Sequence, residues 1–128
     1  MKKEVVGIDG IAPPMEPFNH VIRAGGLLFF TSQLSVDLKT NEIVPGSVSE
    51  QTRRALENLK FLVESCGGTM DDIVKVVIYL RDNKDFAEMN CVYRQFFEPG
   101  REPARVTIQS FSPIDSIDVE IEAIAVAR

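Results

Sequence analysis

The sequence predicts a single α+β domain, residues 1–128, in which two helices pack on one face of a mixed β-sheet. Two observations support this fold class. Two segments carry apolar residues at helical spacing, whereas five others carry the alternating or continuous apolar runs that are typical of strands. The segments follow the order strand, strand, helix, strand, helix, strand, strand, and two helices can cover only one face of such a sheet.

The first two strands follow a proline-rich arm. Three prolines within residues 12–18 exclude a helix there and predict an extended segment that ends at Phe18. Residues 20–23 and 27–34 read as two strands, and Gly25-Gly26 supplies the tight turn between them.

Three polar residues of this region are candidates for a site. Thr31 and Ser32 close an apolar strand, which is typical of a place where a ligand approaches the backbone, although a plain strand end explains them equally well. His20 could act as a ligand or an acid–base group, but a single histidine is more often structural.

The first helix is predicted over residues 48–66. Ser47 and Glu50 have the spacing of a capping box, in which the hydroxyl and the carboxylate each satisfy a free backbone amide. Apolar residues then recur at helical spacing over about five turns. Gly67-Gly68 predicts a left-handed cap that ends the helix.

The second half contains a buried strand, a helix and two further strands. Residues 73–80 are rich in β-branched side chains and almost wholly apolar, which predicts an interior strand. Asp82-Asn83 precede a second helical stripe that ends before Pro99-Gly100. A strand is predicted over residues 104–109. Pro103 precedes it and has no backbone N–H to donate to a neighbouring strand, which favours an edge position. A last strand is predicted over residues 119–127.

Composition excludes several classes of function. No apolar run reaches membrane length and no signal-peptide region follows Met1, so we expect a cytoplasmic protein without a membrane partner. Cys66 and Cys91 read as free thiols, and a single histidine without a Cys/His cluster predicts no metal. The net charge of −5 and the lack of a basic stripe argue against a nucleic-acid partner.

The strand over residues 104–109 alternates in polarity, with Arg105 near its start. If Ala104, Val106 and Ile108 face the helices, Arg105 and Thr107 face the uncovered side of the sheet. A guanidinium on a rigid strand can bind a carboxylate or phosphate through two parallel hydrogen bonds. A solvated arginine, or one paired with a structural acid, is the alternative.

The last strand carries two acids on one face. Small alanines at positions 123 and 125 let a helix approach, which places Glu120 and Glu122 on the uncovered face. One of them either pairs with Arg105 or holds a water while Arg105 binds a substrate carboxylate, and both interpretations stay open. Ile124 and Val126 share that face, and their apolar side chains predict that a second copy of the chain covers it.

Short motifs over nearly the whole chain carry a family resemblance. They are the alanine–proline arm, Thr31-Ser32-Gln33-Leu34, Glu50-Gln51-Thr52-Arg53, Leu56-Glu57-Asn58, residues 71–76, Asp85-Phe86, Pro103-Ala104-Arg105 and residues 119–125. The last two resemble the signature of the Rid (reactive intermediate deaminase) family, also called YjgF, in its RidA-like form. This resemblance implies a chorismate-mutase-like fold assembled as a trimeric barrel, a homotrimer with a site in each cleft between subunits.

The resemblance also implies an activity. Members hydrolyse 2-imino and enamine acids such as 2-aminoacrylate and 2-iminobutanoate, which pyridoxal-phosphate enzymes release, to 2-oxo acids and ammonia without a cofactor or metal. Arg105 would bind the substrate carboxylate through two hydrogen bonds. Glu120 would position and deprotonate the attacking water and return a proton to the departing nitrogen.

Several substrate-binding positions depart from the family pattern. Phe18 stands where a tyrosine is usual, Thr31 replaces a serine, and Ser32 replaces a glycine. Thr107 replaces a common cysteine but keeps the backbone N–H that helps to hold the carboxylate, and Phe111 stands at a position of small residues. Ser32 would be strained if that backbone used a positive φ, and would otherwise narrow the pocket.

Two other functions remain as alternatives. The first is a trimer that binds small 2-oxo acids through Arg105 without turning them over. The second is translation inhibition through RNA cleavage, which the acidic charge disfavours.

Overall fold

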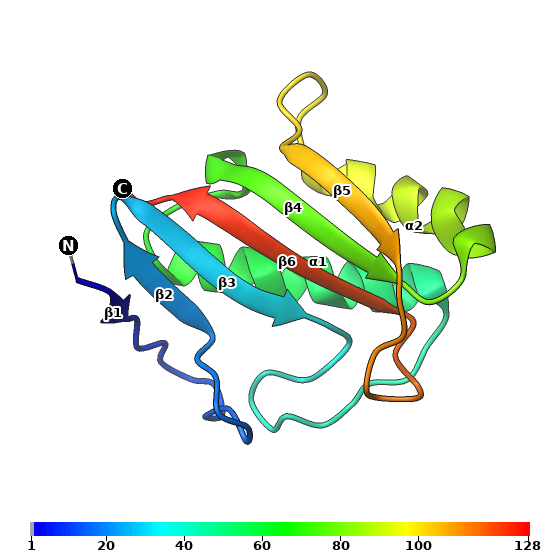
Figure 1. The fold of residues 1–128 in the computed structure, drawn as a ribbon, viewed down its shortest axis with the longest axis horizontal. Coiled ribbons are helices and arrows are strands. Elements are labelled where there is room, and N and C mark those ends of the chain that lie inside the picture. The colour runs from blue at the N-terminus through cyan, green and yellow to red at the C-terminus, as the bar shows by residue number, and fades with distance from the viewer. Residues whose placement is uncertain (1) are drawn as a thin grey trace.

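The computed structural model describes residues 2–128, so Met1 of the predicted domain lies outside the described residues. One six-stranded sheet has the order β1-β2-β3-β6-β4-β5. Two α-helices lie behind it in Figure 1, and its other face is uncovered. The elements are β1 Glu4–Val5, β2 Val21–Ala24, β3 Leu27–Gln33, α1 Val48–Ser65, β4 Ile73–Leu80, α2 Phe86–Tyr93, β5 Ala104–Gln109 and β6 Val119–Val126.

The predicted fold class is confirmed, with two differences in the elements. β1 was not predicted, because a strand of two residues leaves no periodic pattern. The predicted second helix is divided, since 3₁₀ turns at Asn83–Asp85 and Arg94–Phe96 flank α2. None of the helices in residues 2–128 is both long and apolar enough to cross a bilayer.

The sheet is mixed because one connection crosses over. β4 pairs in parallel with β5, and α2 lies in the connection between them. All other pairs are antiparallel. β4 is interior and β5 is an edge strand, as the β-branched run and Pro103 predicted.

Helix α1 begins and ends with the predicted caps. The Ser47 hydroxyl accepts a hydrogen bond from the backbone N–H of Glu50 (3.1 Å), and the Glu50 carboxylate accepts one from the backbone N–H of Ser47 (3.0 Å). These hydrogen bonds lower the pKa of Glu50. Gly67 has a φ of +85°, the left-handed conformation that glycine adopts without strain.

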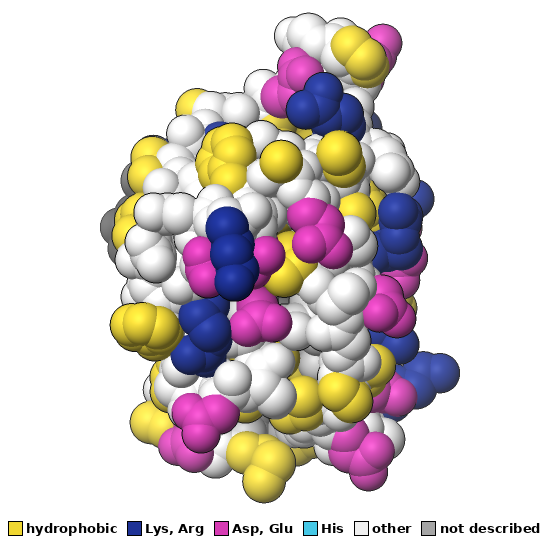
Figure 2. Space-filling model, turned by 90° about the vertical axis from the view of Figure 1, so that its right-hand side faces the viewer, with side chains coloured by type: hydrophobic (Ala, Val, Ile, Leu, Met, Phe, Trp, Pro, Cys, Tyr) yellow, Lys and Arg dark blue, Asp and Glu magenta, His cyan; other side chains and the backbone are white. Residues whose placement is uncertain are grey.

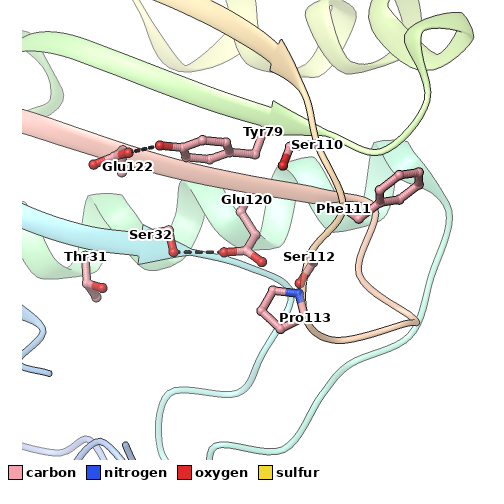
Figure 3. A pocket seen from close by; sticks show the side chains of 9 residues that line it. All are labelled: Thr31, Ser32, Tyr79, Ser110, Phe111, Ser112, Pro113, Glu120 and Glu122. Carbon is pink, nitrogen blue, oxygen red and sulfur yellow. Dashed lines mark hydrogen bonds between the residues drawn. The ribbon is translucent and has the colours of Figure 1, made fainter. Parts of the chain in front are cut away.

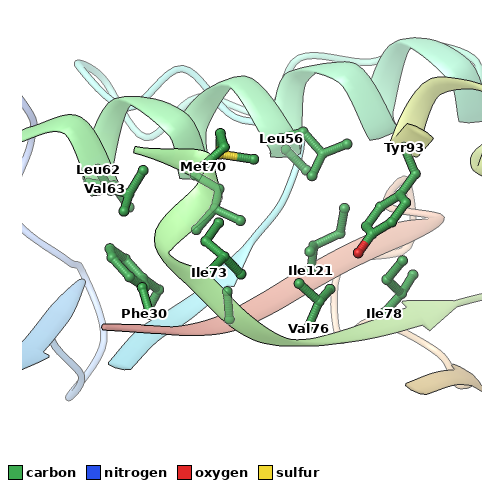
Figure 4. Packing of buried hydrophobic residues seen from close by; sticks show 14 of the residues in the cluster. Phe30, Leu56, Leu62, Val63, Met70, Ile73, Val76, Ile78, Tyr93 and Ile121 are labelled. Atoms are coloured by element: carbon green, nitrogen blue, oxygen red, sulfur yellow. The ribbon is translucent and has the colours of Figure 1, made fainter. Parts of the chain in front are cut away.

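The core lies between α1 and the sheet (Figure 4). One face of α1 contributes Leu56, Leu59 and Leu62, none of which is exposed to solvent. They pack on residues such as Ile78 and Ile121 from the helix-covered face of the sheet. Burial of these side chains fixes which face of β4 and β6 points inward, and therefore which face carries the polar residues of a site.

The faces of β6 are as predicted. Val119, Ile121, Ala123 and Ala125 are buried toward the helices. Residues 120, 122, 124 and 126 alternate with them and lie on the uncovered face, which we call the open face. Glu120 and Glu122 therefore belong to the open face.

The predicted orientation of β5 is wrong. Arg105 is in register with Val76, which is in register with Ala123, and both of these partners are buried toward the helices. Arg105 and Thr107 therefore lie on the helix face, and Val106 and Ile108 lie on the open face. The alternation along β5 identifies which of its residues share a face. It does not show which face the helices cover, because both faces of the whole sheet carry apolar residues.

The open face is rich in exposed apolar side chains. Phe29, Val106, Ile108 and Val126 keep between 39% and 44% of their surface exposed. They come from β3, β5 and β6, which lie at different positions across the sheet in Figure 1. Several exposed apolar side chains on one face of a sheet are typical of a surface that another protein chain covers.

Candidate active site

The open face contains a cavity of about 380 Å³ around Glu120, here called the Glu120 cavity (Figure 3). Side chains from β3, β4, β6 and the β5–β6 loop line it: Thr31, Ser32, Tyr79, Ser110, Phe111, Ser112, Pro113, Glu120 and Glu122. Two of these residues are acidic and none is basic. The cavity therefore suits a ligand that presents hydrogen-bond donors, including water.

A β-bulge in β3 directs two consecutive residues into this cavity. The register between β3 and β6 shifts between Phe30 and Gln33, so Thr31 and Ser32 both line the cavity instead of alternating across the sheet. The Ser32 hydroxyl donates a 2.9 Å hydrogen bond to a Glu120 oxygen. Asn41 is the only non-glycine residue with a positive φ in residues 2–128, so Ser32 carries no strain of that kind.

The second acid of the cavity is held from the opposite side. Tyr79 on β4 donates its phenolic hydrogen to Glu122, and Figure 3 shows the two side chains directed toward each other. This hydrogen bond, together with burial, raises the pKa of the Tyr79 phenol. Tyr79 thus keeps its proton and holds Glu122 as an acceptor, while Ser32 does the same for Glu120.

Arg81 fixes the loop that closes one side of the Glu120 cavity. Its guanidinium donates to the backbone oxygens of Ile117 (2.9 Å) and Ile114 (3.1 Å) and lies 3.4 Å from the Asp118 carboxylate. It also lies over the ring of Phe111, 5.4 Å from the ring centre. Because loops without such contacts are mobile, Arg81 gives this side of the cavity a defined shape.

Arg105 has an aromatic environment on the helix face. Its guanidinium carbon lies 4.7 Å from the ring centre of Tyr93 and 5.5 Å from that of Phe86. Nη1 donates a 2.7 Å hydrogen bond to Oδ1 of Asn90. These three residues belong to α2 and fix the guanidinium by stacking and by one neutral hydrogen bond.

Arg105 forms no ion pair within the part of the chain that the structure describes. Among residues 2–128, no carboxylate lies within ion-pair distance of it. In the described chain, Nη1 makes the one hydrogen bond from this guanidinium that meets distance and angle criteria, to Asn90, so Nε and Nη2 keep N–H groups for a ligand. The edge formed by Nε and Nη2 has the geometry that binds a carboxylate through two parallel hydrogen bonds.

A second cavity, of about 330 Å³, contains Arg105 and is here called the Arg105 cavity. It is lined by Asn90, Tyr93, Arg94, Glu102, Pro103 and Arg105. Burial raises the pKa of Tyr93 to about 12, so this phenol stays neutral. Figure 4 shows its hydroxyl directed toward the sheet, and no protein group in residues 2–128 accepts or donates a hydrogen bond there.

The predicted site residues fall into two groups. Thr31, Ser32 and Glu120 meet in the Glu120 cavity. Arg105 lies on the other face of the sheet with Thr107, whose hydroxyl is buried without a partner in the described chain. Strand β4 separates β5 from β6, so one chain does not bring Arg105 and Glu120 together.

Phe18 lines neither cavity. It is 47% exposed in the proline-rich arm, and its ring meets that of His20 edge to face at 6.2 Å.

Sequence reasoning missed several residues of the two cavities. Tyr79 is, with Lys75, one of two polar residues in an apolar strand, and Asn90 interrupts the apolar stripe of a helix, so each gave a weak local signal. Arg94 and the loop that contains Ser110 gave none, because polar residues in loops and at helix ends are ordinary. Within residues 2–128, no three His, Cys, Asp or Glu side chains form a metal-binding cluster.

Charges of both signs are interspersed on the face of the molecule next to α2. Figure 2 shows the side next to α2, where basic and acidic groups alternate with apolar side chains and no continuous basic stripe is visible. This face therefore lacks the electrostatic pattern of a nucleic-acid-binding surface.

Comparisons with known proteins agree with this architecture. Residues 10–127 match the family model described as Endoribonuclease L-PSP. A RutC family protein of Pyrococcus horikoshii is 42% identical over 123 residues, which cover 96% of this chain and 97% of that protein. A 2-iminobutanoate/2-iminopropanoate deaminase of Dermatophagoides farinae is 32% identical over 124 residues, covering 97% of this chain and 96% of that protein.

Solved structures extend the agreement to three dimensions. The crystal structure of E. coli TdcF with bound serine superposes with a TM-score of 0.85 at 32% identity, and the match covers 98% of this chain and 99% of that one. The family model and the curated relatives each span nearly the whole chain. The chain therefore belongs to the Rid (YjgF, endoribonuclease L-PSP) family.

Proposed function

We propose that this protein hydrolyses reactive 2-imino acids to 2-oxo acids and ammonia. The observation that carries the proposal is the guanidinium of Arg105, which forms no ion pair with residues 2–128 and keeps Nε and Nη2 as donors for a carboxylate. A relative of similar length is named 2-iminobutanoate/2-iminopropanoate deaminase, and a structural relative was solved with bound serine, a small amino acid. Both names fit a site for small amino-acid derivatives.

Glu120 would act as the general base. Water attacks the imine carbon and forms the C–O bond while its proton passes to the Glu120 carboxylate. That proton is returned to the nitrogen, which gives a carbinolamine. The proton of its hydroxyl group then passes to the same nitrogen through Glu120, the C–N bond breaks, and ammonia leaves as the C=O bond of the 2-oxo acid forms. Ser32 holds one Glu120 oxygen at 2.9 Å, so the other oxygen can accept from the water.

The complete site would be formed between two copies of the chain. Arg105 and Glu120 lie on opposite faces of one sheet, separated by β4, so a substrate that touches both needs them from different chains. Arg105 belongs to the edge strand β5, which is accessible to a neighbouring chain. The exposed apolar residues of the open face support burial against further copies, and we propose a homotrimer with three such sites.

A coupled assay tests the proposed activity. A serine dehydratase generates 2-aminoacrylate in the presence and absence of the protein, and the rate of pyruvate release is measured. We expect the wild type to accelerate release above the spontaneous rate. Glu120→Gln should abolish the acceleration while it keeps most of the affinity for 2-oxobutanoate, whereas Arg105→Ala should lose both.

The control separates catalysis from a change in folding. Glu57→Gln alters an exposed glutamate on α1 that lines neither cavity, and it should match the wild type. Equal acceleration by the wild type and Glu120→Gln would reject the proposed mechanism.

A non-catalytic carboxylate binder is the second candidate. Arg105 and its α2 partners are complete within one chain, so carboxylate binding does not require Glu120. Binding of 2-oxobutanoate together with no acceleration of pyruvate release would favour this function. RNA cleavage, which the family model's description names, is opposed by the net charge of −5.

A further inference from the structure

Two arginines line the Arg105 cavity. Arg94, at the C-terminal end of α2, accompanies Arg105 there, and neither has an acidic partner within ion-pair distance in residues 2–128. A single residue joins them. Oδ1 of Asn90 accepts from Nη1 of Arg105 (2.7 Å), and the backbone oxygen of Asn90 accepts from Nε of Arg94 (3.4 Å).

This shared contact limits how far apart the two cations are. The two oxygens of one asparagine lie within about 6 Å of each other from standard bond lengths, so the bonded nitrogens of Arg94 and Arg105 lie within about 12 Å. A dicarboxylate of four or five carbons with a hydrogen bond at each end has a similar length. One such molecule can therefore reach both guanidinium groups.

The acid of the cavity does not neutralise this pair. A Glu102 oxygen accepts a 2.8 Å hydrogen bond from the backbone N–H of Gly100, which commits this carboxylate to the turn before β5. With Arg94, Arg105 and Glu102 as its charged residues, the lining has a net charge of +1 within a chain of net charge −5. The cavity thus attracts anions, and a ligand with two negative groups gains most.

We propose that Arg94 determines substrate specificity and that the site prefers 2-imino acids with a second carboxylate in the side chain. Arg105 would bind the carboxylate next to the imine, and Arg94 would bind the side-chain carboxylate. Tyr93 and Pro103 supply apolar surface for the intervening methylene groups. This inference rests on the proposed function, since it assigns a substrate class to the same Arg105.

Binding of two matched ligands tests the inference without catalysis. Titration calorimetry compares 2-oxoglutarate with 2-oxopentanoate, which has the same number of carbons but one carboxylate. For the wild type we expect 2-oxoglutarate to bind at least about 10-fold more tightly than 2-oxopentanoate, because one additional charge-assisted hydrogen bond contributes about this factor. Arg94→Gln should reduce this ratio to about one while it leaves the affinity for 2-oxopentanoate unchanged.

Lys60→Gln provides the control for charge. It removes one positive charge from an exposed residue of α1 that does not line the Arg105 cavity, and it should keep the wild-type ratio. A wild type that binds both ligands equally would overturn the inference. An Arg94→Gln variant that keeps the ratio, or weakens both ligands alike, would also overturn it, because Arg94 would then be an ordinary surface cation.

Hydrolysis separates this inference from the proposed function. Amino-acid oxidases acting on glutamate and norvaline generate the two corresponding imino acids, and release of the 2-oxo acids is followed with wild type and Arg94→Gln. If both imines are hydrolysed without preference, the specificity inference fails and the proposed function stands. If neither is hydrolysed while the binding ratio holds, the proposed function fails and the two-cation site stands.

Discussion

Arg105 illustrates how neutral groups can hold a charged side chain ready for a ligand. Two aromatic rings and one asparagine oxygen surround it, so its position is fixed while its charge remains uncompensated. An acid in the place of Asn90 would hold it as firmly but would compete with a substrate carboxylate. Asn90 is therefore a positioning residue in the proposed site.

Substitution of Asn90 should affect substrate binding more than chemistry. We expect Asn90→Ala to raise KM about 10-fold with little change in kcat, because one hydrogen bond to a charged group is lost. Asn90→Asp should raise KM further, since the new carboxylate pairs with Arg105. Steady-state kinetics of the coupled pyruvate assay gives the measurement, with Asn83→Ala in the turn before α2 as the control. A fall in kcat at constant KM would contradict the assigned role.

The elements show which patterns in the sequence determine the fold. Three features depend on local chemistry, and each lies where it was predicted. They are the capping box at Ser47 and Glu50, the left-handed glycine after α1, and the β-branched strand β4. The orientation of β5 does not rest on local chemistry, because its apolar residues face an uncovered surface. Only the register of β5 with β4 shows which face of β5 points toward the helices.

The N-terminus of α1 should give the stability a defined pH dependence. Glu50 is stabilised as a carboxylate by its capping hydrogen bonds, so its pKa is lowered from the usual 4.5 in the folded chain. Its contribution is therefore complete above that value and is lost as the pH falls through the lowered pKa. We expect Glu50→Ala to lower the thermal midpoint near neutral pH and to match the wild type in strong acid.

Thermal unfolding followed by circular dichroism at several pH values makes this measurement. Glu57→Ala, at an exposed position on the same helix, serves as the control because Glu57 makes no capping contact. A Glu50→Ala deficit that persisted unchanged into strong acid would show that the carboxylate charge is not the source of the stabilisation.

At the scale of the whole molecule, the sequence could predict the two halves of the candidate site but not their arrangement. Glu120 lies on the open face because its neighbours on β6 are buried, and this alternation is readable. The contacts of Arg105 with α2 depend on how the crossover between β4 and β5 packs, which no local pattern encodes. The site residues lie on two strands. β5, which carries Arg105, is an edge strand, and β6, which carries Glu120, contributes to the open face, so a single chain leaves both exposed to a neighbour.

Assembly can be tested at the open face. We expect the wild type to have a particle mass near three chains and Val106→Glu to fall toward one, because the substitution places a charge on the apolar surface. Phe61→Glu is the matched control, since Phe61 on α1 has the same 44% exposure as Val106 but lies outside the sheet. Light scattering after size-exclusion chromatography gives the masses. Loss of the assembly in both variants, or in neither, would count against the open face as the interface.

The place of β6 has a consequence for how the chain is made. This strand is the last in the sequence, yet it lies between β3 and β4 near the middle of the sheet. Until it leaves the ribosome, β3 and β4 each present an unpaired edge and the core lacks one of its walls. Folding of the domain must therefore wait until β6 has been synthesised, and a chain without β6 would be prone to aggregation.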